Sequence, residues 1–185
     1  DSDSDSTAKT VAVGAAAGAS QFAGSGSVTV NVIKQTTDAT IGKGAYNANG
    51  KDVKVDAKSR AKLFGLSGGL AIASGTGIGA AVDVQTYIGH TYAGIQDGAK
   101  VKNASSVTVN AESAENLTSI GVMAGIGGTF GGAGAAGAHS ITTDTKAYIG
   151  NENDTAVTDA EKAEVSSTGD VAVSATDTTT LTTGA

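Results

Sequence analysis

An internal repeat is the feature that most constrains what this chain can fold into. Two signals recur in the same order, a strand-like V-x-V-x-A segment and a Gly/Ala-rich apolar run. The segments start at Val53, Val107 and Val171, and the runs at Val11, Leu63 and Leu117. Repeats of this length cannot bury their inner face alone, so they stack on their neighbours. The sequence therefore predicts about three stacked copies, 54 to 64 residues long, with a fourth beginning at Leu181.

A third recurring signal is an Ile-Gly pair, at Ile41, Ile88 and Ile149. We expect these isoleucines to occupy equivalent positions, each closing a strand before a turn led by glycine, which reaches positive φ without a Cβ clash. The copies are expected to form one continuous solenoid that is part of a longer protein. Their expected bounds are an acidic, disordered Ser-rich leader or linker at 1–8, copies at 9–61, 62–115 and 116–180, and the start of a further copy at 181–185.

Within each copy the apolar residues alternate with small or polar ones, which is the period of a β-strand. Between Ile78 and Ile88 one face is largely β-branched and the other carries Gly, Ala, Asp, Gln and Tyr. Glycine at this density disfavours helix, so almost no helix is expected. We expect the β-branched face to point inward, with Ile78, Val82, Val84, Ile88, Val107, Val109, Ile120 and Val122 in the core.

The size of the coil is predicted from the length of the strand-rich segments. Each copy holds three of them, about 18 to 21 residues long, and each is long enough for one turn of a β-solenoid. Nine turns stacked at about 4.8 Å would make a rod roughly 45 Å long. The absence of proline fits stacked strands that all donate their N–H groups, and the 4% aromatic content fits a narrow core of Val, Ile and Ala.

Composition excludes several classes of function. The formal net charge is −6, whereas nucleic-acid binding and anionic-membrane binding require a basic surface. The chain has no cysteine, which removes disulfides, zinc–thiolate sites and thiol nucleophiles.

Two short motifs resemble functional fingerprints. Gly65-Leu-Ser67-Gly-Gly69 matches the nucleophile elbow of serine hydrolases, which requires a helix after the serine and a histidine base. Gly75 to Ala80 matches the glycine spacing of dinucleotide-binding loops, which also requires a following helix. A strand is expected after both motifs, and the two histidines, His90 and His139, have no metal-ligand spacing. We therefore expect no catalytic, cofactor-binding or metal-binding residues.

The acidic residues are expected mostly in solvated turns rather than in a catalytic groove. The three Asn-x-Ser/Thr sequons are expected by chance in a chain so rich in Ser and Thr. The acids are Asp52, Asp56, Glu112, Glu115, Asp159, Glu161 and Glu164, and the sequons start at Asn103, Asn116 and Asn153. The acidic loop at 151–164 is the best candidate for a contact surface, because insertions in repeat rods cluster on one face. A plain solvated loop is the alternative.

The uncharged stretch at 117–138 has the length of a membrane span. Its counterparts from Val11 and Leu63 carry polar residues at the same place in the repeat, such as Gln21 and Ser67. The stretch is therefore expected to form a wall of the solenoid instead.

The repeat resembles that of a known family. Val28–Gly42 reads VTVNVIKQTTDATIG, follows a Gly/Ala/Ser run and precedes DVKVDA. This is similar to the repeats of giant filamentous adhesins secreted by the type V routes of Gram-negative bacteria, leukotoxin-like filamentous adhesins and large autotransporter passengers in particular. The likeness covers about Lys9 to Leu181 and rests on a degenerate motif. It implies a right-handed parallel β-helix outside the cell, an outer-membrane translocator during export, and no catalytic residues to carry over.

Two non-catalytic functions follow as expectations. The first is a stalk segment of a secreted surface adhesin that acts in attachment, biofilm formation or virulence, with neighbouring repeats and an unknown host or cell-surface receptor as partners. The second is a self-assembling extracellular filament or matrix subunit, in which like chains pack together. A polysaccharide-acting enzyme on a β-helix scaffold is the third and weakest alternative, because no acid, base and nucleophile converge in the pattern.

Overall fold

The computed structural model describes residues 1–19, 21–152, 158 and 161–185, and its described elements are all β-strands. Seven of these strands are long and three are short, and the strands pair in parallel throughout the described residues. The strands are β1 (Ser2–Gly18), β2 (Phe22–Ile41), β3 (Gly44–Asn47), β4 (Val53–Ala73), β5 (Thr76–Gln96), β6 (Ala99–Ala104), β7 (Val107–Gly127), β8 (Phe130–Gly150), β9 (Glu164–Ser167) and β10 (Val171–Gly184). The chain is therefore a parallel β-solenoid.

The strands form three sheets, and each copy of the repeat gives one strand to each sheet. Sheet A has the order β1-β4-β7-β10, sheet B the order β2-β5-β8, and sheet C the order β3-β6-β9. One copy is thus a single turn of the solenoid, and the prediction of three turns per copy was wrong. One full turn instead consists of two long uninterrupted strands and one short strand, as in β4, β5 and β6.

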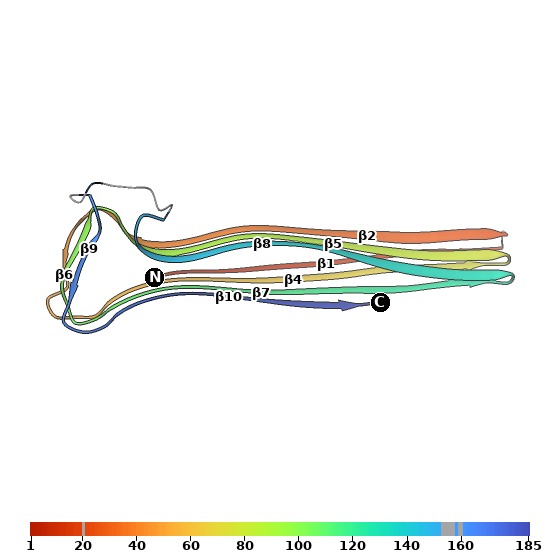
Figure 1. Cartoon of the computed structure of the whole chain (residues 1–185). Helices are drawn as coiled ribbons and strands as arrows, with labels where there is room; N and C mark the ends of the chain where they lie inside the picture. Colours follow the sequence, from red (N-terminus) through yellow and green to blue (C-terminus); the bar gives the residue numbers. More distant parts are fainter. Residues whose placement is uncertain (20, 153–157, 159–160) are drawn as a thin grey trace.

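Figure 1 shows sheets A and B as the two layers of a long flat blade, with sheet C closing one end. Strands of 21 residues reach roughly 70 Å, whereas three stacked turns add only about 14 Å along the solenoid axis. We call the sheet C end the base of the blade, and the opposite end, where Ser74-Gly75 and Gly128-Thr129 connect the two sheets, the tip.

The strand registers confirm the repeat at some positions and correct it at others. Val53 and Val171 both pair with Val107. Ile41 and Ile149 both pair with Ile95, whereas Ile88 pairs with Lys34 and Thr142. Ile88 is therefore not equivalent to the other two isoleucines, and Gly89 lies within β5 rather than in a turn.

The Gly/Ala-rich runs agree with the repeat only in part. Leu63 and Leu181 both pair with Leu117, as the repeat predicts. Val11 instead pairs with Leu66. The first residues are not a disordered leader, since β1 begins at Ser2, and Ser2 pairs with Ala57.

The prediction for the inner face holds only at the base. Val107 and Val109 are 0% exposed. Ile78 and Val122, in contrast, are 41% and 61% exposed and point outward. The alternation places Val82, Val84, Ile88 and Ile120 on the same outer faces, where they are half-buried. The faces were assigned the wrong way round in the tip half of the blade.

The inversion follows from how closely sheets A and B approach each other. A Cβ added to Gly69 on sheet A would lie 2.5 Å from the backbone oxygen of Ala80 on sheet B. A Cβ on Gly79 would lie 2.7 Å from the backbone oxygen of Gly69. Real Cβ atoms do not approach this closely, so the two backbones pack directly on each other. The β-branched side chains consequently point outward.

The buried residues change from large and apolar at the base of the blade to small near its tip. The base holds the apolar core, in which Ile95, Val101 and Val107 from the three sheets meet. A smaller cluster of Leu63, Tyr87 and Leu117 lies further along. Near the tip only small residues pack together, among them Ala23, Ala71 and Ala73. The third copy is longest because residues 151–163 join β8 to β9, where the first two copies have two-residue connections.

Removal of one whole turn should leave the rest folded. Deletion of residues 53–106 joins Asp52 to Val107, which takes the place of Val53 in the register. We expect a shorter solenoid with a β-type circular dichroism spectrum and a cooperative but lower melt, because each turn contacts only its neighbours. Deletion of residues 53–73 alone is the control and should produce aggregates, since it leaves strands without partners. Equal solubility of the two deletions would contradict the stacking.

The inner glycines should tolerate no side chain. Gly69→Ala forces a methyl group against the Ala80 backbone, and we expect it to destabilise the chain by about 1–3 kcal/mol, the usual cost of overpacking. Gly134→Ala is the matched control, because nothing lies within 4 Å of its added Cβ. Thermal denaturation of both variants checks this expectation. A Gly69→Ala melt at or above that of Gly134→Ala would show that the sheets are further apart.

Candidate functional sites

A strip of polar side chains runs through the interior between the apolar clusters. Asp83 and Gln85 on β5 are almost completely buried. Asp83 accepts hydrogen bonds from the hydroxyl of Thr29 and, at 2.9 Å, from the side-chain amide of Gln85. The same amide donates to the backbone oxygen of Thr118 at 2.7 Å. Gly65 provides room for the carboxylate, since a Cβ there would collide with it. This strip pairs its polar groups with one another and ties the two sheets together.

Glu115 is also a buried acid, and it lies on the inner face of β7. Its carboxylate accepts hydrogen bonds from Ser113 and, at 3.2 Å, from the hydroxyl of Thr179 on β10. Burial raises the pKa of Glu115 above its ordinary value. Burial also raises the pKa of Tyr87, whose hydroxyl lies 3.3 Å from that of Ser59. In both groups, burial disfavours the charged form.

An exposed polar cluster lies on the outer face of sheet B near the base. It consists of His90, Tyr92, Asp144 and Lys146, from β5 and β8. The Tyr92 hydroxyl donates to Asp144 at 2.7 Å and lies 3.1 Å from Nδ1 of His90. The Lys146 ammonium lies 3.1 Å from Asp144 and 5.3 Å from the centre of the Tyr92 ring. These contacts link neighbouring turns.

The electrostatics of this cluster oppose proton transfer near neutral pH. Burial and the hydrogen bond to Asp144 raise the pKa of Tyr92 to about 12. The hydrogen bond from Tyr92 lowers the pKa of Asp144, and the bond to Asp144 raises that of Lys146. Tyr92, Asp144 and Lys146 are thus held in their ordinary ionisation states, whereas a general acid or base needs a pKa near the working pH. The cluster is suited to cross-strand stabilisation. Sequence analysis missed it because the two residues on β5 lie 52 to 56 residues from the two on β8, and the pairs meet only through the register of β5 with β8.

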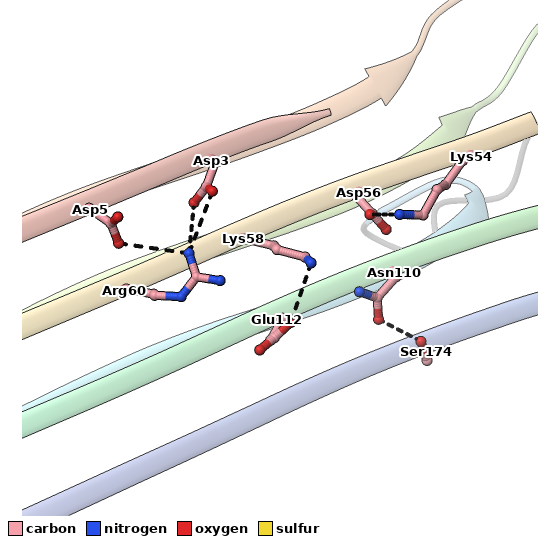
Figure 2. Close-up of polar contacts among 9 residues, drawn as sticks. All are labelled: Asp3, Asp5, Lys54, Asp56, Lys58, Arg60, Asn110, Glu112 and Ser174. Atoms are coloured by element: carbon pink, nitrogen blue, oxygen red, sulfur yellow. Dashed lines mark hydrogen bonds and ion pairs between the residues drawn. The ribbon is translucent and has the colours of Figure 1, made fainter.

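Charged residues on the outer face of sheet A also bridge neighbouring turns (Figure 2). Arg60 on β4 lies 3.2 Å from Asp3 and 3.8 Å from Asp5, both on β1. Lys58 lies 3.9 Å from Glu112 on β7. Exposed pairs of this kind contribute little individually, roughly 0–1 kcal/mol. The DSDSDS segment is therefore the edge of an ion-paired sheet.

The two fingerprint motifs lie inside the solenoid wall. Ser67 is 1% exposed on the inner face of β4, and the chain continues as a strand on both sides of it. Gly75 lies at the tip turn, and β5 follows it directly, so the helix required by a dinucleotide-binding loop is absent here. His90 lies on the outer face of β5, whereas His139 lies on the inner face of β8. Within the described ranges, no group of three or more His, Cys, Asp or Glu is placed to hold a metal ion.

The acids do not lie mostly in turns, as the sequence suggested. Asp56, Glu112, Glu115 and Glu164 are in strands, and Asp56 and Glu115 are buried. Asp52, in contrast, lies outside the strands and accepts a hydrogen bond from Ser106 at 2.7 Å.

The remaining acids and the sequon asparagines lie partly in the acidic loop and partly in strands. Glu161 accepts a hydrogen bond from Thr158 at 2.7 Å in the acidic loop. Asn103 has a positive φ near the end of β6, and Asn116 points outward on β7. Asp159 and Asn153 lie outside the described residues, as does much of the loop at 151–164.

The stretch at 117–138 forms the end of β7, the tip turn and the beginning of β8, so it is a wall of the solenoid. Among the residues with described placement, none belongs to a helix that is long and apolar enough to cross a membrane. Comparisons of the chain with protein-family models, with curated proteins and with solved structures found no match.

The raised pKa of Glu115 predicts how stability changes with pH. Because the folded chain favours the protonated form, this group contributes stability below the ordinary Glu pKa of about 4.3 and loses that contribution as pH rises through its folded pKa. Glu115→Gln removes the buried charge and should raise the melting temperature at pH 7, with little change at pH 3. Glu112→Gln, on the outer face of the same strand, is the control and should not raise it. A lower melting temperature for Glu115→Gln at pH 7 would contradict the assignment.

Proposed function

We propose that this chain is a non-catalytic stalk segment of a secreted bacterial surface adhesin. In this role the solenoid holds a binding region away from the cell, and the protein is exported through an outer-membrane translocator by a type V route. The resemblance of the repeat to filamentous adhesins supplies the biological setting. The proposal assigns no cofactor to the segment.

The observation that carries the structural part of the proposal is the pairing of polar side chains across turns. Asp83, Glu115 and Asp144 accept hydrogen bonds from residues of other strands or turns. Ser67, the serine of the elbow motif, is buried in a strand. These groups are used to hold strands together, and such use favours a mechanical role over a chemical one.

The solenoid can also be extended, which a stalk requires. Val171, Val173 and Leu181 on β10 are in register with the buried Val107, Val109 and Leu117 on β7. These three side chains on β10 are about half exposed, because sheet B has no fourth strand to cover them. A further copy stacked on β8 and β10 would bury them.

A second candidate function is a self-assembling filament or matrix subunit. The specific observation in its favour is the apolar outer surface near the tip, where Val13, Val28 and Val122 are each more than half exposed. Exposed apolar patches on both faces of a sheet sandwich favour association.

The proposed function predicts a chemically inert segment. We expect no turnover in hydrolase screens with ester and polysaccharide substrates, and no stoichiometric metal in elemental analysis of the purified chain. Turnover that disappears in Ser67→Ala would overturn the proposal, as would one tightly held metal per chain. Electron microscopy of the full-length protein separates the two candidates, since a stalk gives single rods and a matrix subunit gives bundled fibres.

A further inference from the structure

The outer face of sheet A carries two lysines that have no acidic partner. Lys9 on β1 pairs with Phe64 on β4, and Lys62 on β4 pairs with Thr7 on β1. The two lysines are thus diagonal neighbours, about 8 Å apart at the backbone. Both are exposed, and within the described residues neither forms an ion pair or a hydrogen bond. We call them the lysine pair.

The nearest acids on this face lie closer to the base and already contact other basic residues. Asp3 and Asp5 contact Arg60, and Glu112 lies 3.9 Å from Lys58 (Figure 2). The lysine pair therefore presents positive charge that nothing on its own face neutralises. Neighbouring ammonium groups bind an anionic group such as a carboxylate through charge-assisted hydrogen bonds.

Two hollows follow one another on this face. The first surrounds the lysine pair, has a volume of about 620 Å³ and is lined partly by Phe64. The second has a volume of about 450 Å³ and an almost entirely apolar lining, which includes Leu66 and Gly68. Phe64, Leu66 and Gly68 are successive outward residues of β4, so the two hollows lie end to end along this strand.

The second hollow lies where β4 lacks a side chain. Gly68 pairs with Val13 on β1 and with Val122 on β7, so a valine stands on either side of it. Leu66 and Leu70 bound the hollow along the strand. Its shape is therefore a short apolar channel rather than a flat surface.

Charge on this face ends at the lysine pair. Leu70, at the far side of the second hollow, lies six residues beyond Phe64, which is a distance of roughly 20 Å. One acyl chain spans about 15 Å, half of the hydrocarbon core of a bilayer. A single long acyl chain with its head at the lysine pair would therefore end within the second hollow. No ionisable side chain occurs in the parts of the three strands nearer the tip, residues 11–18, 64–73 and 118–127.

The face of a sheet also limits the class of ligand. The backbone N–H and C=O groups of a paired strand point to its neighbouring strands, so the face offers them to no ligand. A peptide or a saccharide laid over the second hollow would leave its polar groups against Leu66, Leu70 and Val122 without partners, which is unfavourable. A ligand with one anionic head and no polar group beyond it fits both hollows.

A second copy of the chain does not supply the missing acid. Between the tip and the level of Lys34, the ionisable side chains of sheet B are Asp83, Tyr87 and His139, and all three point inward. Lys34 itself is a further cation on the outer face. The tip half of a second copy would therefore place no carboxylate against the lysine pair, whichever face it presented.

A lipid bilayer surface is also a poorer match. Asp3, Asp5 and Glu112 lie on the same outer face and would approach the lipid headgroups together with the lysine pair. The two hollows, in contrast, occupy a single line along β4, which suits one acyl chain rather than a continuous lipid layer.

We propose that the outer face of sheet A binds one long-chain carboxylate, that is, a fatty acid. The carboxylate lies between Lys9 and Lys62, and the acyl chain lies in the hollow over Gly68. The binding is non-covalent. This inference goes beyond both candidate functions, since neither of them requires a ligand.

The first experiment compares head groups on the unmodified full chain. Isothermal titration calorimetry with dodecanoate, below its critical micelle concentration, should give one site per chain. Dodecyltrimethylammonium has the same acyl length and the opposite charge, and acetate has the same head and no chain. We expect both to bind at least about tenfold more weakly than dodecanoate, because each lacks one of the two contacts. This comparison needs no substitution and so does not depend on how a variant folds.

The second experiment removes the head contact. Lys9→Gln with Lys62→Gln should raise the dissociation constant for dodecanoate about tenfold or more, because hydrogen bonds to a charged partner are lost. Binding of dodecyltrimethylammonium should not weaken. Lys34→Gln with Lys51→Gln is the matched control, since it removes the same charge from exposed positions elsewhere and should leave the affinity for dodecanoate unchanged.

The third experiment disturbs the channel. Val122→Glu places a charge beside the second hollow and should weaken dodecanoate binding to a similar extent. Val30→Glu is its control, because it adds the same charge to a valine of similar exposure on the outer face of sheet B. Melting curves that match the wild type show that each variant is folded.

Other results would overturn the proposal. No binding of monomeric dodecanoate to the wild-type chain would do so, as would equal binding of dodecyltrimethylammonium or an unchanged affinity in the double lysine variant. A loss caused equally by Val30→Glu would move the chain to sheet B. Flotation with phosphatidylcholine vesicles without binding of dodecanoate would assign the face to a lipid surface. Each of these results leaves the stalk function in place.

Discussion

The direct contact of two β-sheet backbones is the constraint on which the rest of this structure depends. Sheets A and B approach so closely that Gly69 and Gly79 have no room for a Cβ. A pair of sheets at this separation cannot enclose large side chains, so the apolar core is displaced to the base, where sheet C opens the solenoid into a triangle. The blade is long because nothing inside it forces the strands to turn before the tip.

The same constraint decides which residues point outward. A strand has only two faces, so glycine on the inner face places the β-branched residues outside. Ile78 and Val122 are exposed for this reason, although their hydrophobicity favours burial. The polar residues that remain inside include Asp83 and Gln85, which are hydrogen-bonded to each other. In the tip half of the blade, polar and small residues therefore lie inside and apolar residues lie outside.

Strand pairing and side-chain contacts between neighbouring turns stabilise the blade, whose interior is too narrow for a large apolar core. Parallel pairing of the long strands satisfies the backbone, and side-chain pairs such as Tyr92 with Asp144 join turn to turn on the surface. In such an array each turn depends on its neighbours, so stability is distributed along the solenoid axis rather than held in one central core. A segment built in this way can transmit position over a distance, which is consistent with the proposed role as a stalk.

The sequence alone determined the β-structure, the stacked repeat and the register of Val53 with Val107 and Val171, because strand period and repeat spacing are local properties that pairing preserves. It did not determine that one copy is one turn, that Ile88 differs from Ile41 and Ile149, or that the β-branched face points outward. Those features depend on how the strands pair within each sheet and on the distance between sheets A and B. A period of two identifies two faces but not which of them is inside. Only the tertiary structure decided that, because the separation of the sheets leaves space for hydrogen atoms and not for side chains.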